Sequence, residues 1–123
     1  MSGDLGAYWK RVARARDFRI RVVVHERRDQ AIDRGKDAIS RSHGDILDFK
    51  MFSNLSLSMI IELSGRQLLS LLDSLQARGW GVEVEPGREA VAGRADEALE
   101  GTLQLTFPEG DGELRIPTPW VPG

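Results

Sequence analysis

The sequence predicts a single domain of the α+β class, and three observations support this prediction. Residues 18–25 and 55–63 alternate between apolar and polar side chains, which is typical of strands with one buried face. Two other segments, 30–42 and 64–79, carry apolar residues at the spacing of one helix face. A chain of 123 residues is long enough to bury one core of ordinary size.

The first half of the domain begins with the strand at residues 18–25. One face of this strand is apolar and is formed by Phe18, Ile20, Val22 and Val24. A polar turn at 26–29 follows, and Asp29 is suited to cap the helix predicted over 30–42. Gly35 lies on the narrow apolar stripe of this helix, which favours a close approach between the helix and a sheet.

The second half contains a hairpin, a helix and a last strand. The alternation at 47–51 and 55–63 predicts two neighbouring strands joined by a polar turn. Ser64 and Gln67 fit a capping box, in which each side chain bonds the backbone amide of the other residue. The last strand, 82–85, ends at a proline, which cannot donate a hydrogen bond to a neighbouring strand.

The predicted order is strand, helix, strand, strand, helix, strand, which is the ferredoxin-like βαββαβ plan. In this plan the first strand lies between the third and the fourth, and both helices cover one face of the sheet. The charges agree, because Arg19 and Arg21 of the first strand would share the open face with Glu83 and Glu85 of its antiparallel neighbour. We therefore predict a ferredoxin-like α+β sandwich over residues 18–86.

Residues 1–17 are predicted to form an N-terminal basic arm or short helix. Tyr8, Trp9 and Val12 share one face of such a helix, while its lysine and arginines are polar. Two interpretations remain open. Either the aromatic face packs on the domain and the charges stay in water, or the arm contacts an acidic partner.

Residues 87–123 form a C-terminal extension of the domain. The polar, glycine-interrupted stretch 87–100 is predicted to be a linker with at most a short helix. Alternation at 102–107 and 113–116, around a glycine- and aspartate-rich turn, predicts a terminal β-hairpin within 101–123. A proline-rich tail follows the hairpin.

Composition excludes several classes of function. A formal net charge of −2 gives no overall attraction to nucleic acid or to an anionic membrane. The absence of cysteine excludes disulfides, thiolate nucleophiles and cysteine-bound metals. With two histidines and no local pair of carboxylates, the chain predicts no metal site, no cofactor and no acid–base pair. It also has no apolar run of membrane-spanning length and no signal-peptide core, so we expect a cytoplasmic protein.

Residues 18–85 resemble an ACT or ACT-like domain, the small regulatory module of amino-acid metabolism. The resemblance rests on the opening strand, on the sequence Gly-Asp-Ile-Leu-Asp at 44–48, which is similar to the family pattern G-x-N-I-x-D, and on the hydrophobic third strand. It implies a homodimer, because such domains associate through helices or sheet edges. It also implies an amino acid bound at that interface, by the loop after the first strand and the start of the second.

Carried over to this chain, the resemblance implies seven site residues. They are Glu26, Arg27, Arg28, Asp29, Gln30, Asp45 and Asp48. The loop has no glycine to bring backbone amides to a ligand, so Arg27 or Arg28 would hold a carboxylate by paired hydrogen bonds instead. Exposed apolar residues, Val23 and Ile60, together with the terminal hairpin, would contact the second subunit.

Three functional hypotheses follow. The first is a non-catalytic, homodimeric regulatory domain that senses a small amino acid. The second is a structural or protein-interaction module without a small ligand, which docks a partner through its N-terminal arm and terminal hairpin. The third is a small enzyme on the same fold with His25 and Arg27 in its site. Because the open sheet face lacks the aromatic residues that stack on bases, nucleic acid is not expected as a partner.

Overall fold

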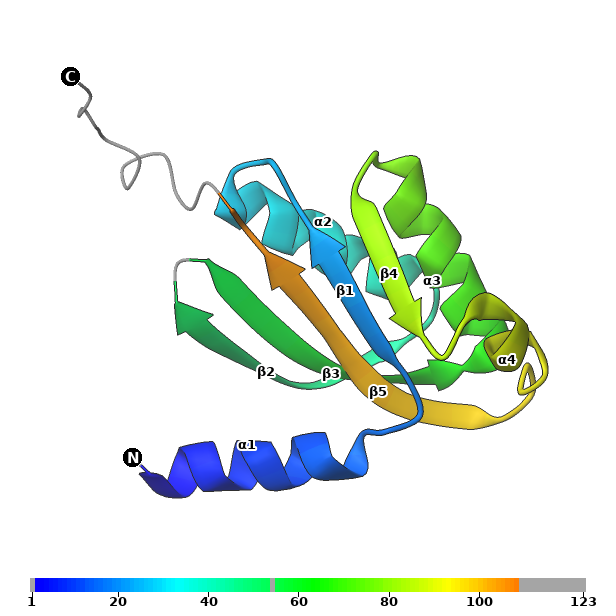
Figure 1. Ribbon diagram of the computed structural model, residues 1–123, viewed down its shortest axis with the longest axis horizontal. Coiled ribbons are helices and arrows are strands. Elements are labelled where there is room, and N and C mark those ends of the chain that lie inside the picture. The colour runs from blue at the N-terminus through cyan, green and yellow to red at the C-terminus, as the bar shows by residue number, and fades with distance from the viewer. Residues whose placement is uncertain (1, 54, 109–123) are drawn as a thin grey trace.

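A computed structural model of the protein describes residues 2–53 and 55–108, and these residues form an α+β fold. One five-stranded mixed sheet is accompanied by helices on both of its faces (Figure 1). In chain order the elements are α1 (Ser2–Arg14), β1 (Arg19–Val23), α2 (Arg28–Arg41), β2 (Asp45–Ser53), β3 (Ser56–Ser64), α3 (Gly65–Ala77), β4 (Gly81–Glu85), α4 (Arg88–Ala92) and β5 (Ala98–Thr106). None of the helices in the described part of the chain is long and apolar enough to cross a membrane.

The order of strands in the sheet is β2-β3-β5-β1-β4. The antiparallel pairing of β1 with β4 agrees with the sequence prediction, and Arg19 lies opposite Glu85 in it. On its other side, however, β1 pairs in parallel with β5 instead of lying next to β3. The fifth strand thus separates two strands that the ferredoxin-like plan places side by side.

The position of β5 also corrects the prediction for the C-terminal extension. Residues 101–107 were expected to begin a terminal hairpin, but β5 has partners on both sides, β1 and β3. It can lie inside the sheet because Leu99, Leu103 and Leu105 are all almost completely buried. The expected second strand of the hairpin, 113–116, lies outside the described residues.

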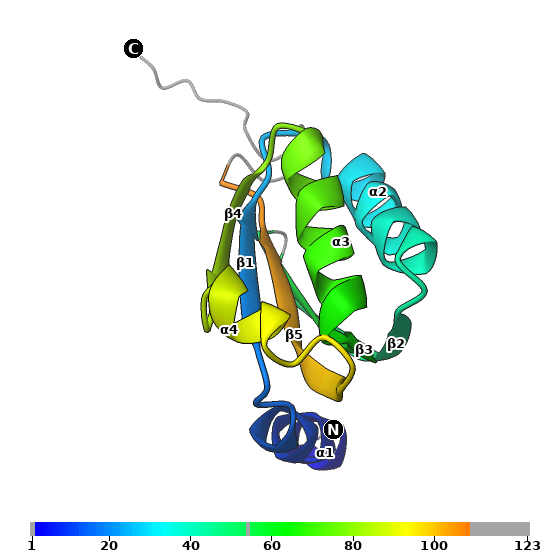
Figure 2. The same cartoon turned by 90° about the vertical axis from the view of Figure 1, so that its right-hand side faces the viewer.

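Two layers of helices enclose the sheet. Helices α2 and α3 lie side by side on one face, and α1 lies apart from them (Figures 1 and 2). The main core lies between the sheet and the α2–α3 pair, and it contains the predicted apolar face of β1: Phe18, Ile20, Val22 and Val24. A side chain at Gly35 would meet Leu105 at 3.6 Å, so α2 approaches the sheet closely, as expected.

Helix α1 packs on the opposite face of the sheet. Tyr8 and Ala15 are buried against Ile60 of β3, which itself has no exposed surface. The expectation that Ile60 is exposed for a second subunit is therefore wrong, because α1 covers it. Among the two interpretations of the arm, this contact agrees with the one in which its aromatic face packs on the domain.

The two long helices on the main core begin in different ways. Helix α3 has the predicted capping box, in which the Ser64 hydroxyl accepts from the Gln67 amide at 3.1 Å and the Gln67 side chain accepts from the Ser64 amide at 2.8 Å. Helix α2 begins earlier than expected, and its N-cap is Arg27, without a side-chain cap. The prediction of Asp29 as N-cap is thus wrong. Asp29 lies in the first turn of α2, where its negative charge interacts favourably with the helix dipole.

Candidate functional site

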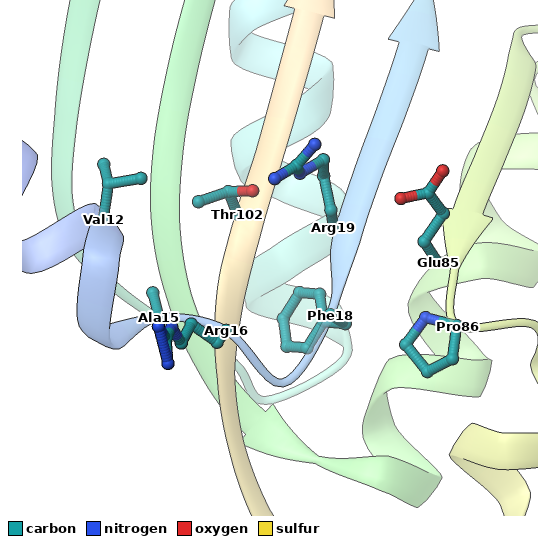
Figure 3. Close-up of a pocket in the computed structure, with 8 residues that line it drawn as sticks. All are labelled: Val12, Ala15, Arg16, Phe18, Arg19, Glu85, Pro86 and Thr102. Carbon is teal, nitrogen blue, oxygen red and sulfur yellow. The ribbon is translucent and has the colours of Figure 1, made fainter.

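A hollow of about 270 Å³ opens on the sheet face that α1 only partly covers. It lies between the C-terminal end of α1 and the ends of β1 and β4 (Figure 3). The residues that line it are Val12, Ala15, Arg16, Phe18, Arg19, Glu85, Pro86 and Thr102. We refer to this hollow as the α1–β4 cavity.

Strand register brings three polar side chains into one row across the floor of the cavity. Arg19 of β1 lies opposite Glu85 of β4 in the antiparallel ladder and beside Thr102 of β5 in the parallel one. Residues paired across neighbouring strands project on the same face, so a hydroxyl, a guanidinium and a carboxylate follow one another (Figure 3). The cavity can therefore offer opposite charges to one small molecule.

The remaining wall of the α1–β4 cavity is mainly apolar. Val12 and Ala15 come from α1 and its C-terminal end, Phe18 leads into β1, and Pro86 follows β4. Phe18 is almost fully buried and belongs to the main core, so this wall is held in place by the core itself. An apolar group of a ligand would find contact surface beside the charged row.

Charges around the cavity are unequal. Glu85 accepts from Arg21 at 3.0 Å through its Oε2 atom, and both side chains are about half exposed or more, 47% for Arg21 and 63% for Glu85. Two arginines, Arg16 and Arg19, line the cavity together with Glu85, whereas Arg21 is not part of its lining. Two positive charges against one negative charge in the lining favour a ligand with an anionic group.

A second hollow of about 210 Å³ lies along the other side of the same row. It shares Val12, Arg19 and Thr102 with the α1–β4 cavity and extends towards Trp9 and Gln104. Arg19 and Thr102 thus stand between two hollows. The guanidinium of Arg19 can therefore bind a ligand in either hollow.

Glu26 of the sequence-predicted site has two structural partners. Its carboxylate accepts from Arg34 at 2.8 Å and from the indole of Trp80 at 2.7 Å. This joins the loop after β1 to α2 and to the residue before β4. Next to it, Arg27 and Asp29 form an exposed ion pair of 3.3 Å, and hydrogen bonding by the Gln30 amide, with help from Arg27, lowers the pKa of Asp29.

Arg28 and Gln30 directly follow this loop, but the structure brings neither Asp45 nor Asp48 to it. Arg28 and Gln30 lie in the first turn of α2. Asp45 is level with Glu62 and Glu100, whereas the end of β1 is level with Thr106, roughly 20 Å further along the strands. Asp48 lies on β2, one of the two edge strands, and accepts from the Phe49 amide at 2.8 Å. Within one chain, the seven residues do not converge.

Arg19 and Glu85 were recognised in the sequence as cross-strand neighbours, but not as part of a site. Thr102 could not be placed beside them, because its strand was expected in a terminal hairpin and not between β1 and β3. His25, the base of the hypothetical enzyme, is exposed just after β1. Within residues 2–53 and 55–108, no group of three or more His, Asp or Glu side chains is arranged to hold a metal ion. No protein-family model, curated protein or solved structure matches this chain.

Proposed function

We propose that this protein is a non-catalytic, ACT-like regulatory domain that binds a small amino acid in the α1–β4 cavity. The observation that carries the proposal is the facing pair Arg19 and Glu85 beside an apolar wall. An amino acid presents three groups that complement these features: a carboxylate for Arg19, an ammonium group for Glu85 and, in most cases, an apolar side chain for the wall.

The chemistry of recognition follows from the row of side chains. The Arg19 guanidinium is suited to hold a carboxylate by two parallel hydrogen bonds, and the Thr102 hydroxyl lies next to it. Glu85 can accept from an ammonium group through its Oε1 atom while Arg21 holds Oε2. The side chain of the amino acid would then rest on Val12 of α1.

Size and exposure point to a small ligand that is held weakly. A volume of about 270 Å³ is just below the range of about 300–1,000 Å³ that is usual for drug-sized ligands. Exposed ion pairs contribute no more than about 1 kcal/mol each, because water and salt screen them. We therefore expect a dissociation constant between about 10 μM and 1 mM, which suits the sensing of an abundant metabolite.

The order of the elements along the chain, as distinct from the order of strands in the sheet, supports the ACT-like part of the proposal. The element order from β1 to β4 and the antiparallel β1–β4 pair are those expected of such a domain. Two features are additional: strand β5 between β1 and β3, and helix α1 on the second face. Because these additions build the cavity, the proposed ligand position differs from the loop at 26–30.

The test is a calorimetric titration of the full chain with the individual amino acids. Arg19→Gln should weaken binding at least tenfold. Arg66→Gln removes an exposed arginine of α3, which is paired with Asp96, and should leave binding unchanged. Glu85→Gln should weaken binding of the amino acid but not of its α-hydroxy analogue, which lacks the ammonium group. If no amino acid binds at millimolar concentration, or if Arg19→Gln binds as well as the wild type, the proposal is wrong.

A further inference from the structure

The second hollow beside α1, of about 210 Å³, differs from the α1–β4 cavity in its chemistry. We call it the aromatic hollow and define it by six of its lining residues: Trp9, Phe52, Ser58, Gln104, Arg19 and Arg21. The described residues that line it include two arginines and no aspartate or glutamate, whereas Glu85 lines the α1–β4 cavity. The aromatic hollow therefore offers positive charge to an anion but no carboxylate to an ammonium group.

The order of strands places the aromatic and the cationic parts of this hollow at opposite ends. Phe52 lies on β2 and the two arginines lie on β1, with β3 and β5 between these strands. Since neighbouring strands are about 4.8 Å apart, the two ends are about 14 Å apart at the backbone. Side chains from both ends line the same hollow, so the space between them suits a molecule with a single ring.

Three rings form the aromatic end. Trp9 packs on Phe52 with 5.6 Å between ring centroids, and Tyr8 packs edge-on against both of them at 5.8 and 6.0 Å. Tyr8 is almost completely buried and thereby fixes the cluster on the sheet, while Trp9 and Phe52 remain 50% and 42% exposed. Their exposed surfaces can contact a further planar ring in the stacked or edge-to-face geometry that aromatic groups prefer.

Two guanidinium groups form the cationic end. Arg19 and Arg21 are two residues apart on β1, so both project on the exposed face of the strand, about 7 Å from one another. The Arg19 side chain extends towards Thr102, its neighbour on β5 (Figure 3). Arg21 donates one hydrogen bond to Glu85, at 3.0 Å, and its guanidinium has further N–H groups for a ligand. Together the two arginines can bind one carboxylate by charge-assisted hydrogen bonds.

Hydrogen-bond donors lie on the floor between the two ends. Ser58 of β3 is directly opposite Gln104 of β5 in the antiparallel ladder. The Gln104 side-chain amide donates to the Ser56 hydroxyl at 3.2 Å, which fixes its orientation, and its second N–H is a donor for a ligand. The Ser58 hydroxyl is also a donor. A carboxylate in this hollow would thus meet donors on the floor as well as at the cationic end.

We propose that the aromatic hollow binds a small aromatic carboxylate: one planar ring with one carboxylate and no ammonium group. The ring packs on Trp9 and Phe52, and the carboxylate lies between Arg19 and Arg21. An amino acid fits this hollow less well, because its ammonium group would find no carboxylate there. A volume of about 210 Å³ is below the range of about 300–1,000 Å³ that is usual for drug-sized ligands, so it also favours a single ring over a nucleotide.

The test is a calorimetric titration of the full chain with benzoate as the probe. Benzoate should bind with a dissociation constant in the millimolar range or below. Benzamide has the same ring without the charge, and cyclohexanecarboxylate has the charge without the aromatic ring, so each should bind more weakly than benzoate. Benzamide that binds as tightly as benzoate would overturn the proposal, and so would a wild-type chain that binds no benzoate at millimolar concentration.

Two variants locate the site. Trp9→Leu removes a ring from the aromatic end and should weaken benzoate binding roughly fivefold. Arg21→Gln removes a charged donor and should weaken it roughly tenfold. The matched controls are Phe49→Leu, an equally exposed ring of β2 that does not line the hollow, and Arg16→Gln, an arginine that lines only the α1–β4 cavity. Both controls should bind benzoate as the wild type does, and circular dichroism establishes that each variant is folded.

The outcome separates this site from the α1–β4 cavity. Arg19 and Thr102 line both hollows, so only residues that line one of them are diagnostic. Benzoate binding that is weakened by Arg16→Gln but not by Trp9→Leu or Arg21→Gln would place the anion in the α1–β4 cavity and overturn the proposal. Trp9→Leu leaves the lining of that cavity intact and should still bind an amino acid such as alanine. Failure of amino acids to bind would therefore count against the proposed function alone, because benzoate tests the aromatic hollow directly.

Discussion

The indole N–H of Trp80 donates to the Glu26 carboxylate at 2.7 Å, although the two residues are 54 positions apart in the chain. Trp80 is 7% exposed, so this bond is formed largely out of water. The second oxygen of Glu26 accepts from Arg34 at 2.8 Å. One carboxylate thus fixes the loop after β1 to α2 and to the start of β4, at the end of the sheet away from the α1–β4 cavity.

Removal of the Glu26 carboxylate should therefore lower stability. Glu26→Ala leaves the Trp80 N–H without its partner, and we expect a loss of about 1–3 kcal/mol in the free energy of unfolding. Glu26→Gln keeps an acceptor for the indole and loses only the charge, so its loss should be smaller. Urea unfolding followed by tryptophan fluorescence measures both. Glu83→Gln, an exposed carboxylate on β4, is the control, and equal stability of all three variants would contradict the structural role of Glu26.

Gly101 of β5 should not tolerate a side chain. A Cβ at this position would come closer than van der Waals contact to the Phe18 carbonyl oxygen and to the Phe18 ring. Because both obstacles belong to the core and backbone, Gly101→Ala should cost about 1–3 kcal/mol of stability. Gly81→Ala, where the structure leaves open space around the added methyl group, is the matched control. Thermal unfolding measures both variants, and equal melting temperatures for Gly101→Ala and Gly81→Ala would contradict this packing.

Much of the fold could be predicted because its signals are local. The alternation in β1, the hairpin of β2 and β3 and the capping box at Ser64 each depend on a few neighbouring residues. The antiparallel β1–β4 pair was also predicted, since Arg19 and Arg21 match Glu83 and Glu85 in charge. Local patterns of this kind are reliable because packing against the core requires the same spacing of apolar residues along each strand or helix.

The position of β5 could not be read from local pattern. An alternating strand such as 98–106 fits the end of a sheet, a hairpin or the middle of a sheet equally well, and the choice depends on distant partners in β1 and β3. Once this strand was assigned to a terminal hairpin, Thr102 could not be placed beside Arg19. The loop at Glu26 was chosen by family resemblance, whereas the cavity depends on α1 and β5, which the resemblance does not cover.

Ser64 offers a direct test of the capping box. Ser64→Ala removes the hydroxyl that accepts from the Gln67 amide, so one amide at the start of α3 loses its partner. We expect a loss of about 1 kcal/mol in the free energy of unfolding, measured in urea. Ser70→Ala, at an exposed position within α3, should be neutral or slightly stabilising, because alanine is the better helix former. A Ser64→Ala variant as stable as Ser70→Ala would show that the cap contributes nothing.

Tyr8 is buried where α1 contacts the sheet, and its hydroxyl is buried as well. It forms no hydrogen bond with the described residues. Tyr8→Phe removes this buried polar group and keeps the ring against Phe52, so its stability should equal or exceed that of the wild type at neutral pH. Tyr8→Ala removes the ring as well and should cost about 3–5 kcal/mol.

The titration of Tyr8 gives this contact a pH signature. Burial raises the pKa of Tyr8 above its usual value of 10.0, the Ser58 hydroxyl opposes this rise, and the Asp48 carboxylate adds to it. Above pH 10 the folded state therefore holds the phenolic proton more tightly than the unfolded state, so stability declines as the pH rises through the folded pKa. Tyr8→Phe should lose less stability over that range. Because Tyr8 is the one tyrosine of the chain, tyrosinate absorbance reports its pKa directly, and a midpoint at or below pH 10 would contradict the buried position.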